Sequence, residues 1–88
     1  MRRAAKVDMN HAAIVKALRK IGCLVWDTSR MGGGFPDAIA CLGYRVKMLE
    51  FKTPGGKLTP QQEKFHGQWR KHACVVETPE QAIAEMTR

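Results

Sequence analysis

Gly43 and the tyrosine after it constrain the fold more than any other feature of this chain. They separate two runs of β-forming residues, at about positions 36–42 and 45–52. Glycine at the first central position favours a two-residue type II′ turn, so the runs are predicted to pair as an antiparallel hairpin. In that register Asp37 lies directly opposite Glu50, with Cβ atoms about 4.5–5.5 Å apart on one face. The turn therefore predicts two carboxylates side by side at the open end of a hairpin.

Helices are predicted on both sides of this hairpin. Apolar residues recur at helical spacing over residues 7–21, and Gly22 marks the expected end of that helix. The pattern Thr-Pro-x-Gln supplies an N-cap, a first-turn proline and a capping-box glutamine. It occurs at residues 59–62, before a helix expected to reach about residue 71, and again at residues 78–81. With short strands at about 23–27 and 73–77, the element order is α-β-β-β-α-β-α.

Side chains in these elements divide into an expected core and an expected surface. On the first helix Ile14, Val15, Leu18 and Ile21 should be buried, with Asp8 or Asn10 as the N-cap. Elsewhere the expected core residues are Trp26, Phe65 and Trp69. The three cysteines lie far apart in apolar stretches and are expected to be buried free thiols of a reducing compartment.

Composition narrows the class of protein. The 88 residues are 44% hydrophobic, which suits one globular domain spanning residues 1–88 rather than a disordered chain. Fifteen Lys and Arg against eight Asp and Glu give a net charge of +7, which favours a polyanionic partner, most plausibly nucleic acid. An acidic membrane surface is the alternative, and the charge alone does not decide between the two. No apolar run approaches the roughly 18 residues of a membrane span. We therefore expect a cytoplasmic protein without a membrane segment.

The hairpin end holds the residues that point to chemistry. Lys52 projects from the same face as Asp37 and Glu50, beside the flexible glycines at positions 32–34. Two facing carboxylates repel each other, and a divalent cation with hard oxygen ligands, Mg²⁺ or Mn²⁺, removes that conflict. Such an ion can polarise a phosphodiester, while Lys52 can orient water or stabilise the transition state. The alternative interpretation is an ordinary surface ion pair worth about 0–1 kcal/mol.

The ordered motifs resemble a known nuclease superfamily. Gly34-Phe35-Pro36-Asp37, Glu50-Phe51-Lys52 and Leu58-Thr59-Pro60-Gln61-Gln62 together are similar to the PD-(D/E)xK nucleases, and most to their virus-type replication-repair nuclease (VRR-NUC) domains in the small stand-alone phage form. The resemblance covers nearly the whole chain. It implies an α/β fold with a restriction-endonuclease-like core, αβββαβ, in which helices flank a mixed central sheet.

The resemblance also implies roles for individual residues. Asp37 and Glu50 match the metal-binding carboxylates of the family, Lys52 matches its catalytic lysine, and the backbone carbonyl of Phe51 would complete the metal shell. Gln62 matches a glutamine near the catalytic centre, although its position also suits a purely structural capping box.

One family feature is absent from this sequence. Family members usually carry a glutamate on the first helix that reaches the metal directly or through water, and residues 7–21 contain none. His11 and Asp8 are the nearest substitutes. Asp8 can equally be only an N-cap, and His11 only a surface residue.

Basic residues around the predicted site are candidates for phosphate contacts. Arg30, Lys57, Lys64, Arg70 and Lys71 flank it, and each can equally be an ordinary solvated charge. Gly33, within the glycine loop, would let the backbone approach DNA closely.

The predicted function is a Mg²⁺- or Mn²⁺-dependent endonuclease acting on branched or duplex DNA. The resemblance implies a homodimer similar to Holliday-junction resolvases, and the small size of the chain makes a C₂ dimer a natural substrate clamp. The alternatives are a flap or nicking nuclease of broader structure selectivity, and a catalytically idle DNA-binding module of the same fold.

Overall fold

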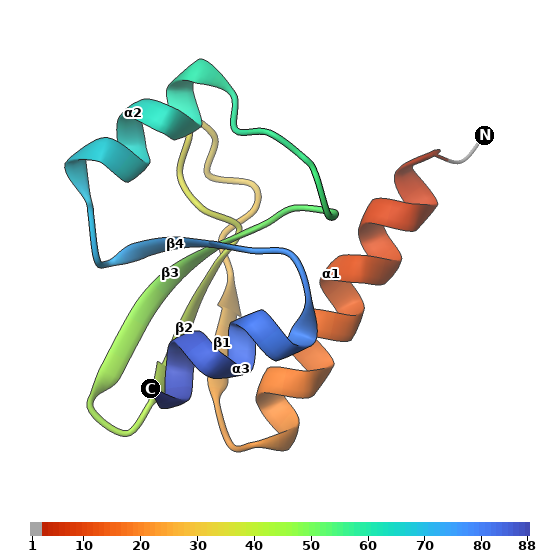
Figure 1. Ribbon diagram of the computed structural model, residues 1–88, viewed down its shortest axis with the longest axis vertical. Coiled ribbons are helices and arrows are strands. Elements are labelled where there is room, and N and C mark those ends of the chain that lie inside the picture. Colours follow the sequence, from red (N-terminus) through yellow and green to blue (C-terminus); the bar gives the residue numbers. More distant parts are fainter. Residues whose placement is uncertain (1–2) are drawn as a thin grey trace.

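The computed structural model describes the backbone of residues 3–88 and the side chains from residue 9 onward. Its elements follow the predicted order (Figure 1). They are α1 (Arg3–Lys20), β1 (Leu24–Asp27), β2 (Ala38–Leu42), β3 (Arg45–Phe51), α2 (Pro60–Gln68), β4 (Ala73–Val76) and α3 (Pro79–Thr87).

The four strands form one mixed sheet in the order β1-β2-β3-β4. The first three strands are antiparallel, and β4 runs parallel to β3 after the crossover through α2. In the central hairpin Leu42 pairs with Arg45 and Ala38 with Leu49, which is the register predicted from the turn. Gly43 has a φ of +62°, as the first central residue of a type II′ turn requires. The α/β fold with a mixed central sheet, which the family resemblance implies, is confirmed.

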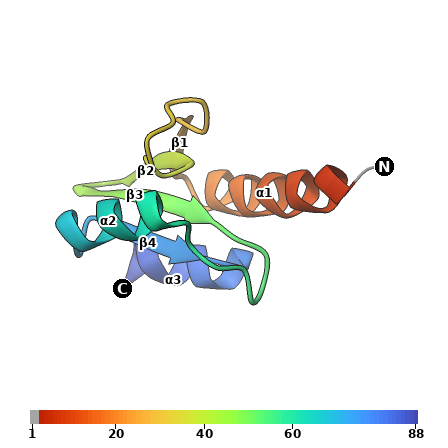
Figure 2. The ribbon, with the colours of Figure 1, turned by 90° about the horizontal axis from the view of Figure 1, so that it is seen from above.

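Two helices cover one face of the sheet and the third lies over the other face (Figure 2). Helices α1 and α3 pack on each other and contribute Ile14, Leu18 and Met86 to the core. The sheet meets them with alternate residues of its strands, such as Leu49 and Phe51. Glu50, between these two, therefore points to the opposite face, where α2 lies.

Helix α1 is longer at its start than predicted. It begins at Arg3 rather than at residue 7, because residues 4–6 are Ala-Ala-Lys, all strong helix formers. Neither Asp8 nor Asn10 is therefore its N-cap, and that prediction is wrong. The predicted end is confirmed: Gly22 has a φ of +98°, and the N–H groups of Gly22 and Cys23 donate to the carbonyls of Arg19 and Leu18 in a Schellman arrangement.

Helix α2 begins as predicted and ends earlier. Thr59 accepts the backbone N–H of Gln62, and Gln62 accepts the backbone N–H of Thr59, which forms a complete capping box. The helix ends at Gln68 instead of residue 71, and Lys71 then takes a positive φ of 75° in the turn to β4. Four strand bounds also differ from the prediction by one or two residues, at β1, β2, β3 and β4.

Several residues expected in the core lie on the surface instead. Trp26 is 74% exposed, Trp69 48% and Ile21 38%, while Phe65 is half-buried. Trp26 is exposed because β1 is an edge strand and its side chain points away from α1 and α3. On α2 no residue is fully buried, and Trp69 instead stacks on Phe65 with ring centroids 5.5 Å apart. All three cysteines are free, as predicted, but only Cys23 is buried as expected, whereas Cys41 and Cys74 are half-buried.

Candidate active site

Asp37 and Glu50 meet where the β2–β3 hairpin opens. Asp37 immediately precedes Ala38, the first residue of β2, and its Oδ2 accepts the backbone N–H of Phe51 at 2.8 Å. Because Phe51 follows Glu50 on β3, this bond fixes the Asp37 carboxylate against the Glu50 side chain. The hairpin register therefore brings the two carboxylates together, as the position of Gly43 predicts.

The Glu50 carboxylate is buried and only partly satisfied. The residue is 3% exposed, and its Oε1 has no hydrogen-bond partner among the residues whose side chains the structure describes. Burial first, and then the negative charge of the adjacent Asp37 carboxylate, raises the pKa of Glu50 to about 8, while the charge of Lys52 acts in the opposite direction. A carboxyl group whose pKa is raised this far is typical of a functional position.

Gln62 connects this carboxylate to α2. Its Nε2 donates to Glu50 Oε2 at 3.2 Å, while its Oε1 accepts the backbone N–H of Thr59 at 2.9 Å. The sequence offered two interpretations of Gln62, a capping-box residue and a residue near the catalytic centre, and its contacts agree with both. The amide oxygen caps the helix, and the amide nitrogen reaches Glu50.

Lys52 lies directly beside the carboxylates. Its Nζ stands 3.8 Å from Glu50 Oε2, and its side chain is 20% exposed. The backbone at this residue is fixed by Asn10 on α1, whose Nδ2 donates to the carbonyls of Lys52 at 3.1 Å and Glu77 at 3.3 Å. This contact ties α1 to the ends of β3 and β4 and thereby holds the lysine in place.

A cleft of about 390 Å³ contains these groups. It is lined by all four candidate catalytic residues, Asp37, Glu50, Lys52 and Gln62, and also by Phe51, Lys57 and His11. His11 packs edge-on against the ring of Phe51 at 5.2 Å, and its buried Nε2 has no hydrogen-bond partner from residue 9 onward. Asp8 belongs to α1, but its side chain lies outside the part of the chain that the structure describes.

The donor set of the cleft suits a hard divalent cation. Among the described residues no three His, Cys, Asp or Glu side chains are grouped closely enough to hold a metal ion by themselves. Asp37 and Glu50 would therefore need backbone or water oxygens to complete a shell, which is the coordination that Mg²⁺ prefers. The unpartnered Oε1 of Glu50 leaves one oxygen free for that purpose. On these observations the residues present fit the implied metal.

The glycine loop, residues 28–37 between β1 and β2, contains Gly32, Gly33 and Gly34, and hydrogen bonds hold it at both ends. Thr28 is buried, and it binds Asp37 O through its N–H and Pro36 O through its hydroxyl, each at 2.8 Å. At Gly34, φ is +88°, and a Cβ would lie 2.5 Å from the carbonyl oxygen of Gln61. Only glycine lets the loop approach the first turn of α2 this closely.

The candidate DNA-binding residues fall into four places. Lys57 lines the cleft itself. Gly33 and Lys64 line a neighbouring hollow of about 260 Å³ against α2. Arg30 lies in the glycine loop, close enough to Asp27 for its charge to help lower the pKa of that carboxyl after the two hydrogen bonds from Ser29. Arg70 and Lys71 are exposed in the turn between α2 and β4.

Three residues around the site were not identified from the sequence. Asn10 and Thr28 anchor the backbone at Lys52 and Asp37, and His66 of α2 has a buried Nε2 without a partner. Burial first, and the charge of Lys52 to a lesser extent, lowers the pKa of His66. Only Asn10 carried a sequence signal, because it lies one turn from Ile14 on the buried side of α1, where a polar side chain needs a partner.

The fold and this cluster define the class of protein. A mixed four-stranded sheet flanked by three helices presents two carboxylates, a lysine and a glutamine at one end of its hairpin. A solved structure described as "VRR_NUC domain" is similar to this chain, with a TM-score of 0.75 and 25% identity over 90% of this chain and 91% of that one. The chain therefore has the VRR-NUC fold, as its motifs predict. No family model and no curated protein matches the sequence.

Proposed function

We propose that this protein is a Mg²⁺- or Mn²⁺-dependent nuclease that hydrolyses phosphodiester bonds of DNA. The observation that carries the proposal is the pair of half-buried Asp37 and buried Glu50, in which one Glu50 oxygen has no partner among the described residues and Lys52 lies 3.8 Å from the same carboxylate. The likeness to a VRR_NUC domain structure supports the same assignment. Two adjacent carboxylates in one cleft repel each other, and a divalent cation bound between them would relieve this repulsion and also bind a phosphate.

Each residue of the cleft has a proposed part in the reaction. Asp37, Glu50 and the Phe51 carbonyl would hold the cation, which supplies Lewis-acid activation of the scissile phosphate when bound. Lys52 places its ammonium beside the reacting phosphate, where it orients the attacking water or stabilises developing negative charge. Gln62 holds Glu50 Oε2 and so keeps Oε1 turned toward the cation.

His11 is the proposed substitute for the glutamate that the first helix lacks. It lines the cleft from α1, and its buried Nε2 has no partner within the described chain. A neutral imidazole in this position can accept a hydrogen bond from a water molecule in the shell of the cation. Asp8, one turn earlier, is the second proposal for this role.

Phosphate contacts are proposed on both sides of the cleft. Lys57 lies inside it, and Lys64 and Gly33 share the adjoining hollow, so a strand leaving the cleft toward α2 would meet a positive charge and an open backbone. Arg30 is proposed to contact the strand on the side of the glycine loop.

We propose further that the protein acts as a homodimer on branched DNA. Helix α2 covers only part of its side of the sheet. On the uncovered part, over β1, β2 and β3, the strands carry two rows of paired apolar residues, Leu24–Cys41–Val46 and Trp26–Ile39–Met48. Leu24, Trp26 and Val46 are more than half exposed. The rows contain no charged side chain, so two chains of charge +7 repel each other least here, and an apolar patch is complementary to its own copy.

A panel of labelled DNAs tests the proposed activity. A four-way junction, a flap and a linear duplex are incubated with the protein in Mg²⁺, in Mn²⁺ or in EDTA. Cleavage of the junction in either metal and none in EDTA is the expected result. Preferential cutting of the flap would instead support the broader flap nuclease, and binding of DNA without cleavage in any metal would contradict the enzyme assignment.

A further inference from the structure

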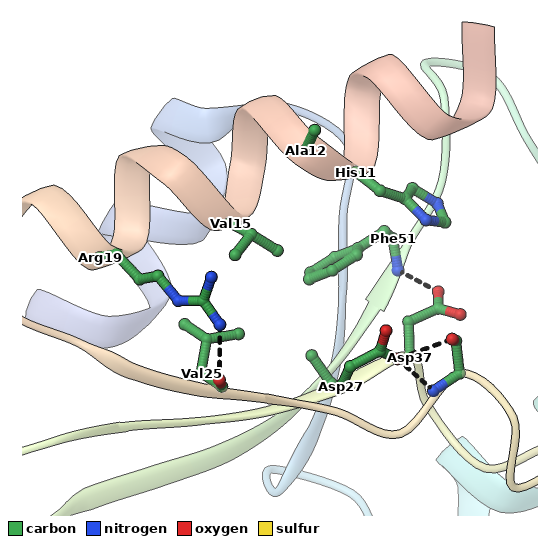
Figure 3. Close-up of a pocket in the computed structure, with 10 residues that line it drawn as sticks. His11, Ala12, Val15, Arg19, Val25, Asp27, Asp37 and Phe51 are labelled. Atoms are coloured by element: carbon green, nitrogen blue, oxygen red, sulfur yellow. Dashed lines mark hydrogen bonds between the residues drawn. The ribbon is translucent and has the colours of Figure 1, made fainter. Parts of the chain in front are cut away.

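A second cavity opens between α1 and the sheet, next to the catalytic cleft (Figure 3). Its volume is about 280 Å³. Ala12 and Val15 of α1 form one wall and Val25 of β1 faces them, while the ring of Phe51 closes the side toward β3. The walls are therefore mostly apolar, and a flat ring would find apolar contacts on both of its faces.

The cavity adjoins the catalytic cleft. His11, Asp37 and Phe51 line both. These three are already joined to one another, since Phe51 donates its N–H to Asp37 Oδ2 and stacks edge-on against His11. A group bound in the cavity would consequently stand directly beside a phosphate bound at Asp37 and Glu50, as the base of an adjoining nucleotide does.

The polar groups of the cavity favour a base over a second phosphate. Asp27 and Asp37 put two carboxylates on its border, and the hydrogen bonds from the N–H and hydroxyl of Ser29 hold the pKa of Asp27 below its usual range. Arg19 directs one guanidinium nitrogen to the carbonyl of Val25 at 3.0 Å. The two carboxylates outnumber the one guanidinium group, so the cavity disfavours an anion, whereas the exocyclic amine of a nucleobase could donate to Asp27.

We infer that this cavity accepts an unpaired nucleobase from the nucleotide next to the scissile phosphodiester. The inference rests on the proposed nuclease function and adds the feature of DNA that the site selects. Unpairing and unstacking a base from continuous duplex costs free energy, and the cost is smallest where the base is already unpaired. Branch points and flaps offer such a base, so the cavity gives a physical origin for structure selectivity.

The test combines a cavity-filling variant with a substrate that lacks the base. Ala12→Leu places three additional carbons in the cavity, and Ala13→Leu, at the neighbouring exposed position outside the cavity, is its control. Cleavage is measured under single-turnover conditions on a branched DNA and on the same DNA with an abasic site beside the cut. Ala12→Leu should slow cleavage of the intact DNA at least about tenfold and leave cleavage of the abasic DNA at the wild-type rate, whereas Ala13→Leu should change neither.

Two outcomes would overturn the inference: Ala12→Leu cleaving intact DNA as fast as the wild type, or slowing both substrates equally. A binding measurement separates this failure from failure of the proposed activity. With 2-aminopurine at the flanking position and EDTA present, binding should raise the fluorescence for the wild type and Ala13→Leu and not for Ala12→Leu. That result without any cleavage in Mg²⁺ would support the base site and contradict the nuclease, and an unchanged signal for the wild type would contradict the base site.

Discussion

Gln62 donates a hydrogen bond to Glu50 Oε2 with the same amide group whose oxygen caps α2 at Thr59. The position of a catalytic candidate on β3 therefore depends on how a helix begins. Since the capping box is a short-range structure, the orientation of the Glu50 carboxylate is built into the local sequence of residues 59–62 as well as into the hairpin.

This relationship predicts a separation of stability from activity. Thr59→Ala removes the hydroxyl half of the capping box and should cost about 0.5–2 kcal/mol of stability with little loss of cleavage rate, because the Thr59 N–H still holds Gln62 Oε1 and the bond from Gln62 to Glu50 remains. Gln62→Ala removes both contacts and should cost a similar stability together with at least about tenfold in rate. Urea unfolding and single-turnover cleavage check the two variants, and equal cleavage by both would show that the bond to Glu50 has no part in activity.

The raised pKa of Glu50 predicts how stability depends on pH without metal. A carboxyl whose pKa rises from 4.5 in the unfolded chain to about 8 in the folded one stabilises the fold fully below about pH 4.5, and this contribution is lost as the pH rises through 8. In EDTA the Tm should therefore fall between these pH values, and Glu50→Gln should flatten that part of the profile. Glu80→Gln, at an exposed position on α3, should leave it unchanged.

Metal should reverse this trend. The cation binds the ionised carboxylate and must displace the proton of Glu50, so its affinity rises with pH. Mg²⁺ should raise the Tm of the wild type more at pH 8 than at pH 6, and it should have no such effect on Glu50→Gln. A Tm increase of equal size at both pH values would place the cation elsewhere.

Gly34 is predicted to be essential for the packing of the glycine loop. Gly34→Ala both forces a side chain into a φ of +88° and brings its Cβ to 2.5 Å from Gln61 O. Gly32→Ala is the matched control, because its φ of +73° is equally unfavourable and a Cβ there meets nothing within 4 Å. The control should cost about 1–2 kcal/mol, and Gly34→Ala clearly more. Equal Tm values for the two would show that the loop can move away from α2.

If the two chains meet through the proposed apolar face, a single charged side chain introduced there should dissociate the dimer. Trp26→Arg introduces a cation into the uncharged rows and should shift the protein to a monomer in light scattering. Met9→Arg, at an equally exposed position on α1, should leave the dimer intact. A wild-type protein that is monomeric over the whole concentration range would contradict the homodimer.

The features that the sequence predicted correctly depend on neighbouring residues. The turn at Gly43 sets the hairpin register and with it the approach of Asp37 to Glu50, and the Thr-Pro-x-Gln patterns set the starts of α2 and α3. Each rests on the local backbone conformation of two to four residues, for which the residue types are strongly selective.

The features that it did not predict depend on contacts between distant segments. Trp26 and Trp69 are exposed because β1 is an edge strand and α2 covers only the β4 side of the sheet, and neither fact is encoded near the tryptophans themselves. The contacts of Asn10 with Lys52 and Glu77 span 42 and 67 positions. Likewise the cavity beside the cleft exists only where α1 passes over β1.

The central claim is that Glu50 binds the cation on which DNA cleavage depends. Its most direct test is the single-turnover cleavage rate of a four-way junction in Mg²⁺ by Glu50→Gln, which keeps the size of the side chain and removes its charge, compared with Glu80→Gln. Glu50→Gln is predicted to lower the rate at least about 100-fold, the order of magnitude by which loss of one electrostatic group slows other active sites, with DNA binding retained. Cleavage by Glu50→Gln at the rate of Glu80→Gln would contradict the account.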